Sequence, residues 1–323
     1  MNSRALLVVT GLPALWFSLS AIGADAQQNA EPNADAKNIK QDISSLQLRA
    51  SQGDAKAECL LGWSYMTGTG VSQNYTEAAR YLRQAAEQDS PDAEFALGYL
   101  YEQGKGVARD YRKAAVYYTA AARQGHVTAE NNLGSMYEFG RGVRKNLHQA
   151  GNWYRMAAER GEVTAQCNLA TLYFRGKGIA RDRSQAADWF RKAAELGFTP
   201  AQENLAWMYF TGTGVPLDYS QAARWVQMAA NKGYSRAQLD LGYLYEHGKG
   251  VLLNYISAYM WYKTAASGGE ERAARRLKNL SAVMTKEQIS QASAAAEQLS
   301  KSMPRVDAAG ASQSIGSSFI GWR

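Results

Sequence analysis

The sequence contains few of the residues and patterns that catalysis or metal binding requires. Only three histidines occur, His126, His148 and His247, and none has a second histidine or a cysteine at metal-ligand spacing. Gly-Lys-Ser/Thr, Ser-x-x-Lys and Lys-Thr-Gly are absent from all 323 residues, which excludes phosphate-binding loops and serine penicillin-recognising enzymes of the usual kind. We expect no catalytic residue, cofactor or metal, and we expect the histidines to be solvated residues of loops or helix edges.

Long apolar runs are absent after the first 26 residues. The chain begins with a single Arg4, continues through an apolar core over 5–19 and reaches the small-x-small triplet Ala24-Asp25-Ala26. That order is typical of a cleaved secretory signal peptide, and the core is too short for a comfortable membrane span. We therefore predict a signal peptide over 1–26 and a periplasmic or secreted mature chain without a transmembrane segment.

Charge is also modest, with a formal net value of +7. A basic chain admits nucleic acid as a partner in principle. No nucleic-acid-binding motif occurs, however, and an exported protein seldom encounters nucleic acid. An acidic protein, peptidoglycan or another anionic envelope component is the partner that positive charge suits here. The plainer explanation of the charge is solubility.

What the chain has in abundance is one repeated pattern. Leu-Gly or Leu-Ala recurs every 36 residues, a tyrosine follows three residues later, and Gly-x-Gly comes next. The six dipeptides begin at Leu61, Leu97, Leu133, Leu169, Leu205 and Leu241. A fixed period of this length indicates a solenoid, in which each repeat buries its apolar face against its neighbours.

Each repeat predicts two helices. Between 92 and 125, small and apolar residues at spacings of three and four form a first helix that Gly104 and Gly106 end. A second helix then runs from Asp110 to Gly125. All six repeats offer Asp or Asn at its start, the types preferred at an N-cap: Asn74, Asp110, Asn146, Asp182, Asp218 and Asn254. The predicted fold is an all-α solenoid of stacked αα-hairpins.

The repeat phases also predict the organisation of the whole chain. Thr285 to Gln288 resembles a capping box that starts a last helix, and terminal caps stop a solenoid from stacking end to end. The predicted segments are a flexible linker over 27–37, a capping helix over 38–53, six repeats over 54–269, capping helices over 270–303 and a disordered tail over 304–323.

The two cysteines, Cys59 and Cys167, occupy one phase of the repeat, three repeats apart. Packed helices lie about 8–10 Å apart, so these positions are about 25–30 Å apart. A disulfide requires Cα atoms within about 7 Å. We expect both thiols to be free or to bridge to another chain.

The pattern Ala-x-x-x-Leu-Gly-x-x-Tyr-x-x-Gly-x-Gly-Val, which runs from Ala93 to Val107, resembles the repeat of the Sel-one-like family of tetratricopeptide-like solenoids. The resemblance extends from 38 to about 302. It implies a right-handed superhelix and an adaptor or regulatory role, often in exported bacterial proteins. A cysteine-rich branch has been linked with binding and weak hydrolysis of β-lactams, but its cysteine pair in each repeat is missing here.

Two surfaces are candidate binding sites. The similarity to tetratricopeptide solenoids implies that the side chains opposite the Leu-Gly-Tyr face of each first helix line a concave groove. Large aromatic residues there are expected to anchor a partner, although packing against the next helix would explain them too. We call these the groove residues: Cys59, Trp63, Met66, Phe95, Tyr99, Asn131, Trp207 and Tyr243.

The loops between the helices provide the second surface. Equivalent loops of a solenoid fall on one edge, so their cations form a ridge whose binding weakens as salt rises; a merely solvated edge is the alternative. We call this the basic edge: Lys105, Arg109, Arg141, Arg144, Lys145, Lys177 and Arg181.

Taken together, these features predict a non-enzymatic scaffold or regulator of the cell envelope or secreted space, which binds a protein, peptide or domain in the aromatic groove. A periplasmic repressor that binds a sensor-kinase ectodomain would be a special case. The alternative is a protein that binds cell-wall fragments or β-lactams with weak hydrolase activity.

Overall fold

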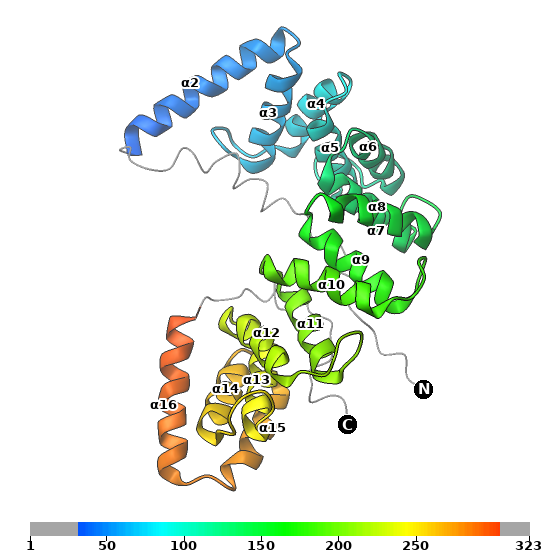
Figure 1. The fold of residues 1–323 in the computed structure, drawn as a ribbon. Coiled ribbons are helices and arrows are strands. Elements are labelled where there is room, and N and C mark those ends of the chain that lie inside the picture. Colours follow the sequence, from blue (N-terminus) through cyan, green and yellow to red (C-terminus); the bar gives the residue numbers. More distant parts are fainter. Residues whose placement is uncertain (1–31, 304–323) are drawn as a thin grey trace. The chain divides into compact units, whose positions relative to one another are not determined.

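A computed structural model describes residues 32–303, with side chains from residue 42 onwards. The predicted signal peptide, the tail over 304–323 and the start of the predicted linker lie outside these residues. All regular structure in the described range is helical (Figure 1), so the predicted all-α solenoid class is confirmed. None of these helices is both long enough and apolar enough to cross a membrane.

Each repeat folds into a first and a second helix. The first helices of repeats 1 to 6 are α3 (Ala55–Thr67), α5 (Pro91–Gln103), α7 (Val127–Phe139), α9 (Val163–Arg175), α11 (Thr199–Thr211) and α13 (Ser235–His247). The second helices are α4 (Tyr75–Ala86), α6 (Tyr111–Arg123), α8 (Leu147–Glu159), α10 (Arg183–Glu195), α12 (Tyr219–Asn231) and α14 (Tyr255–Ser267).

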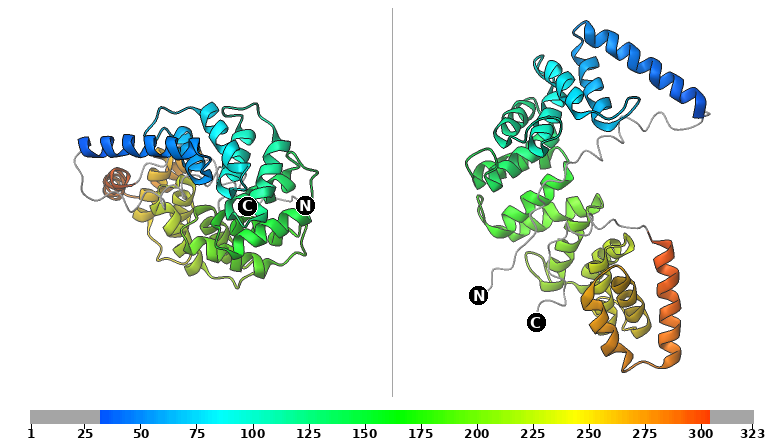
Figure 2. Two further views of the ribbon diagram at one scale, coloured as in Figure 1. Left: turned by 90° about the horizontal axis from the view of Figure 1, so that it is seen from above. Right: turned by 180° about the vertical axis from the view of Figure 1, so that it is seen from behind.

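Three further helices flank the repeats. The first of them, α2 (Pro32–Ser51), begins six residues before the predicted capping helix, and proline is favourable at such a start because it fits the first turn of a helix. At the other end lie α15 (Glu271–Ser281) and α16 (Lys286–Ser302), and α16 runs beside α14 (Figure 2). The predicted capping box of Thr285 and Gln288 is present.

The predicted N-caps are confirmed in all six second helices. In repeat 2, Oδ1 of Asp110 accepts hydrogen bonds from the backbone N–H groups of Arg112 and Lys113, at 2.9 and 3.0 Å. The other repeats use the equivalent Asn or Asp in the same way. These side chains fix where each second helix begins, because they satisfy donors that the helix cannot satisfy itself.

The second glycine of each Gly-x-Gly joins one repeat to the previous one. Gly106 has a φ of +67°, and a Cβ there would lie 2.2 Å from the carbonyl group of Tyr75, the first residue of α4. Only glycine combines this left-handed conformation with so close an approach to backbone. The turn therefore determines how tightly repeat 2 stacks on repeat 1.

The glycine of Leu-Gly serves the packing inside one repeat. A Cβ at Gly98 would lie 2.6 Å from the ring of Tyr118 on α6. Tyr118 is fully buried, and its hydroxyl donates a 2.8 Å hydrogen bond to Glu102. Repeats 3 and 6 hold the same Gly–Tyr–Glu combination.

Repeats 4 and 5 replace all three members of that combination. In repeat 5 the glycine becomes Ala206, the tyrosine becomes Val226 and the glutamate becomes Phe210. Repeat 4 carries alanine, Phe190 and phenylalanine at the same places. Where the first helix has alanine instead of glycine, the second helix therefore has valine or phenylalanine instead of tyrosine. The exchange keeps the space between the two helices filled.

The chain divides into two compact units, which we call the N-terminal unit (described residues 32–165) and the C-terminal unit (166–303), with the boundary inside α9. In the N-terminal unit each helix from α2 to α7 packs against the next one, and in the C-terminal unit the same holds from α10 to α14. Tyr118 and Tyr154 are the largest fully buried side chains of the N-terminal unit, and Phe190 and Tyr262 those of the C-terminal unit. Alanines at helical spacing surround them and allow close approach of the helices.

Candidate functional site

Most of the predicted groove residues contribute to the core. Of the eight, six are buried: Cys59, Met66, Phe95, Tyr99, Asn131 and Tyr243. A first helix inside a solenoid is covered by its own second helix and by the neighbouring repeat, so little of its surface remains free. Packing against the next helix, the alternative explanation for these side chains, accounts for them. Only Trp63 and Trp207 are half-buried and keep exposed surface.

Phe95 is buried beneath a histidine. Its ring stacks on His126 with centroids 4.4 Å apart, and Nδ1 of His126 accepts the N–H of Ala129 as the N-cap of α7. Burial lowers the pKa of His126, so the ring stays neutral and packs as an apolar group at neutral pH. The expectation of a solvated histidine is therefore wrong at this position.

Tyr99 and Tyr243 are engaged with cations of the same loops. The ammonium group of Lys105 donates a 3.0 Å hydrogen bond to the hydroxyl of Tyr99, and this bond raises the pKa of the lysine. Lys249 lies over the ring of Tyr243, and His247 packs on that ring at 4.2 Å. These tyrosines hold loop cations in place rather than facing outward.

The two cysteines form no disulfide with each other, as their phase predicted, and both are buried. Burial raises the pKa of Cys59 to about 11. A thiol with so high a pKa is a weak nucleophile at neutral pH. Within the described residues there is also no group of three or more His, Cys, Asp or Glu side chains that could hold a metal ion.

Trp207 has a second aromatic residue beside it. The ring of Phe174 meets it edge-on, with centroids 5.6 Å apart, and both residues belong to the C-terminal unit. In the N-terminal unit Trp63 packs partly against the core and partly faces outward. Each unit therefore presents one tryptophan at the same phase of its repeat.

The basic edge retains more surface than the groove residues. Five of its seven members are exposed: Arg109, Arg144, Lys145, Lys177 and Arg181. The other two are half-buried, because Lys105 bonds Tyr99 and Arg141 lies over the ring of Phe139 at 5.3 Å. The exposed members are free to attract an anionic surface.

The same edge changes its chemistry in repeats 5 and 6. One loop position, which holds Arg109, Lys145 and Arg181 in repeats 2 to 4, holds Leu217 and Leu253 there, exposed by 55% and 58% of their surface. Leu252, exposed by 90%, precedes Leu253. The sequence analysis considered only the arginines and lysines of this edge. It missed the exposed leucines, although they can be read directly from the loop sequences.

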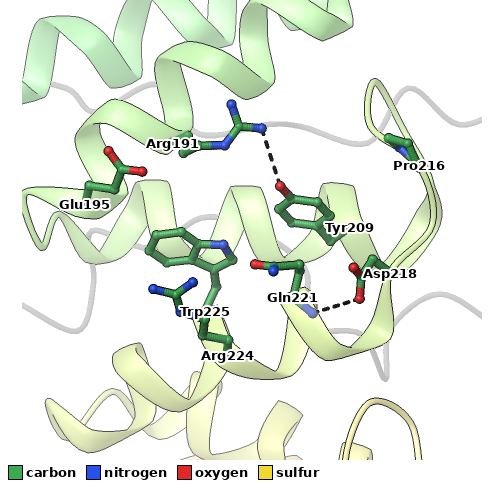
Figure 3. Close-up of a pocket in the computed structure, with 8 residues that line it drawn as sticks. All are labelled: Arg191, Glu195, Tyr209, Pro216, Asp218, Gln221, Arg224 and Trp225. Atoms are coloured by element: carbon green, nitrogen blue, oxygen red, sulfur yellow. Dashed lines mark hydrogen bonds between the residues drawn. The ribbon is translucent and has the colours of Figure 1, made fainter.

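A cavity of about 420 Å³ lies in the C-terminal unit between α10, α11 and α12 (Figure 3). Tyr209, the repeated tyrosine of α11, and Trp225 of α12 both line it. Sequence reasoning missed this site too. The signal was an aromatic residue at one phase of every second helix: Tyr81, Tyr117, Trp153, Trp189, Trp225 and Trp261.

Arg191 of α10 reaches across the same cavity. Its guanidinium donates to Asp188 at 2.7 Å and to the hydroxyl of Tyr209 at 3.4 Å. The bond to Tyr209 is the main reason that the pKa of Arg191 is raised. One wall of the cavity therefore carries a guanidinium that Asp188 and Tyr209 hold in place.

Comparison with solved structures supports this architecture. The chain is 32% identical to a protective antigen from uropathogenic Escherichia coli that displays an SLR fold, with a TM-score of 0.74, and the match covers 80% of this chain and 57% of the antigen. This chain thus spans little more than half the antigen's length. It is also 32% identical to a Sel1 repeat protein from Oxalobacter formigenes, with a TM-score of 0.63, over 72% of this chain and 93% of that one.

A search of the curated proteins finds no match. The Sel1 repeat, by contrast, matches six consecutive segments, whose limits agree with the repeats in the structure: 55–90, 91–126, 127–162, 163–198, 199–234 and 235–270. These segments cover two thirds of the sequence, and the resemblance drawn from the motifs is confirmed. The chain belongs to the Sel1 repeat family.

Proposed function

We propose that this protein is an exported, non-enzymatic scaffold that holds a protein partner through Trp63 and Trp207. The observation that carries the proposal is that these two alone among the predicted groove residues keep exposed surface, one in each unit. Sel1 repeats typically serve protein–protein interaction, and tryptophan is enriched among the residues that dominate interface energies. The proposed export rests on the first 26 residues of the sequence.

The basic edge favours an acidic partner. Its exposed arginines and lysines stand on successive loops, where their fields add and accelerate the approach of an anionic surface. Such attraction is screened beyond about 8 Å at physiological salt. We therefore expect salt to lower the association rate, while the tryptophans determine how long the complex lasts.

The test is a crosslinking capture from the native envelope fraction with three forms of the full chain. These are the wild type, the Trp63→Ala/Trp207→Ala variant and a matched Trp153→Ala/Trp189→Ala variant. The control also removes one half-buried tryptophan from each unit, but from second helices. We expect proteins that the wild type and the control capture and that the first variant loses.

Two results would contradict the proposal. Equal capture by all three forms would show that the tryptophans do not bind the partner. Turnover of nitrocefin that persists through purification, or sedimentation with peptidoglycan in the absence of any captured protein, would favour the cell-wall and β-lactam alternative instead.

A further inference from the structure

The cavity of the C-terminal unit lies at a position that stacked rings occupy in repeats 1 and 2. In repeat 2 the tyrosine of the first helix and the aromatic residue of the second, Tyr101 and Tyr117, stack with centroids 5.6 Å apart and an interplanar angle of 8°. Repeat 1 has the same stack. In repeat 5 the corresponding Tyr209 and Trp225 lie on two sides of the cavity instead (Figure 3).

Two of the groups around this space have a hydrogen-bond donor that no group of the described chain accepts. Trp225 is only 4% exposed, and its indole N–H has no acceptor. Tyr209 accepts a hydrogen bond from Arg191, which leaves its own hydroxyl proton to donate. An unpaired buried donor costs free energy, so an acceptor atom from outside would be favoured here.

Gln221 lies beside the indole at the open side of the cavity. In Figure 3 the nitrogen edge of Trp225 is turned toward Gln221 and Tyr209. The Gln221 side chain is half-exposed, so it can turn outward and let a ligand oxygen reach the indole N–H. Its amide group would then be a further donor at the rim.

The charges around the cavity limit what can enter. Arg191 and Arg224 contribute two positive charges, and Glu195 and Asp218 contribute two negative ones. Asp188 adds a third negative charge, because it forms a 2.7 Å ion pair with Arg191. Asp218 is engaged as the N-cap of α12, where it accepts from Ser220 at 2.9 Å. Glu195 is exposed and lies on the far side of the Trp225 ring from Tyr209. Because these acids repel anions, a ligand with one negative charge is disfavoured less than a phosphate with two.

We propose that the cavity between α10, α11 and α12 is a binding site for the carboxylate of an acidic side chain of the protein partner. The carboxylate would accept hydrogen bonds from Arg191, Tyr209 and the indole of Trp225, a set of partly charged bonds in a partly enclosed site. The nature of the ligand rests on the proposed scaffold function. The site itself is tested independently of that function.

The test follows the indole N–H signal of Trp225 in the full ¹⁵N-labelled chain, assigned by its disappearance in Trp225→Phe. Acetyl-glutamate N-methylamide is the probe, and its neutral glutamine analogue is the control ligand. A fragment of this size binds with a dissociation constant of about 1 mM or weaker. We expect a saturable shift of this signal with the glutamate probe and none with the glutamine analogue.

Three variants sharpen the result. Arg191→Met should weaken binding by about tenfold or more, because it removes a charged donor, whereas Arg83→Met, the equivalent change in repeat 1, should leave it unchanged. Glu195→Gln should tighten binding by about twofold, because an opposing exposed charge is lost. Circular dichroism would verify that each variant is folded.

The proposal is wrong if the glutamate probe causes no saturable shift, if the glutamine analogue shifts the signal equally, or if Arg83→Met weakens binding as much as Arg191→Met. Saturable titration by the probe without capture of any protein partner would overturn the scaffold function and leave the carboxylate site standing. Capture of a partner without titration by the probe would overturn the carboxylate site and leave the scaffold function standing.

Discussion

The N-terminal and C-terminal units have different side chains at one buried position near the start of the first helix of each repeat, and these side chains form different hydrogen bonds. In the N-terminal unit this position is a buried glutamate, which accepts a hydrogen bond from the end of the same repeat: Glu58 from Gln88, Glu94 from Gln124 and Glu130 from Arg160. In the C-terminal unit the position is a glutamine, and two of these donate to the last turn of the preceding second helix: Gln202 to Ala194 and Gln238 to Ala230.

The difference shows that one backbone arrangement can be held by an acid or by an amide, with different sensitivity to pH. Burial raises the pKa of Glu58, Glu94 and Glu130 above the usual value for a glutamate. Such groups contribute most to stability below the unfolded pKa, and the contribution is lost as pH rises through the folded pKa. The glutamines carry no charge and no such dependence. We therefore expect rising pH to weaken the N-terminal unit more than the C-terminal unit.

The largest expected effect comes from the contact between glycine and tyrosine. Gly98→Ala would place a methyl group 2.6 Å from the fully buried ring of Tyr118. We expect a loss of about 3 kcal/mol in the free energy of unfolding, the upper range for overpacking. Urea denaturation measures it. An unchanged midpoint would mean that α5 and α6 can move apart freely.

The C-terminal unit offers a way to rescue that variant. Adding Tyr118→Val and Glu102→Phe to Gly98→Ala reproduces the combination of repeat 5, Ala206, Val226 and Phe210. We expect the triple variant to recover at least half of the lost stability, because volume is conserved and no buried carboxyl loses its partner. If the triple variant is less stable than Gly98→Ala alone, the two combinations are not interchangeable.

A smaller effect is expected from placing an acid in the C-terminal unit. Gln202 is fully buried, and its amide donates a 3.0 Å hydrogen bond to the carbonyl of Ala194. Gln202→Glu replaces this donor by an oxygen, at a cost of about 2 kcal/mol at pH 7. Below the pKa of the buried acid, its protonated hydroxyl can donate again. The loss, followed by thermal unfolding, should therefore shrink as pH falls, and a loss independent of pH would contradict this account.

The smallest effect is the reverse exchange in the N-terminal unit. Glu94→Gln keeps an oxygen to accept from Gln124 and removes a carboxylate that burial disfavours. We expect a gain of about 1 kcal/mol or less at pH 7 and none at pH 4, where the wild-type acid is protonated. The matched control is Glu130→Gln, which should destabilise at pH 7 because it breaks the 2.8 Å ion pair with Arg160. A gain in both variants would show that burial outweighs the ion pair.

The sequence predicted the fold closely because each repeat contains residues that mark where its helices begin and end. Asp110 and its equivalents mark where second helices start, and paired glycines such as Gly104 and Gly106 mark the turns, so local chemistry alone is sufficient. The start of α2 was misplaced because it was taken from the phase of the repeats, which α2 exceeds by six residues.

The candidate site was less predictable, since phase gives the face of a helix but not what covers it. Phe95 shares the predicted groove face with Trp63, yet His126, which ends the same repeat and caps α7, covers its ring. The separation of Tyr209 from Trp225 depends on how three helices pack, which no periodicity encodes.

The most direct measurement of the central claim is a double-mutant cycle on the captured partner, with Trp63→Ala, Trp207→Ala and their combination compared by equilibrium affinity. If both units contact the partner, each single change weakens binding by about fivefold or more, and the two losses add within about 0.5 kcal/mol, as expected for separate anchors. Wild-type affinity in either single variant would contradict the account, because that tryptophan would not be part of the interface.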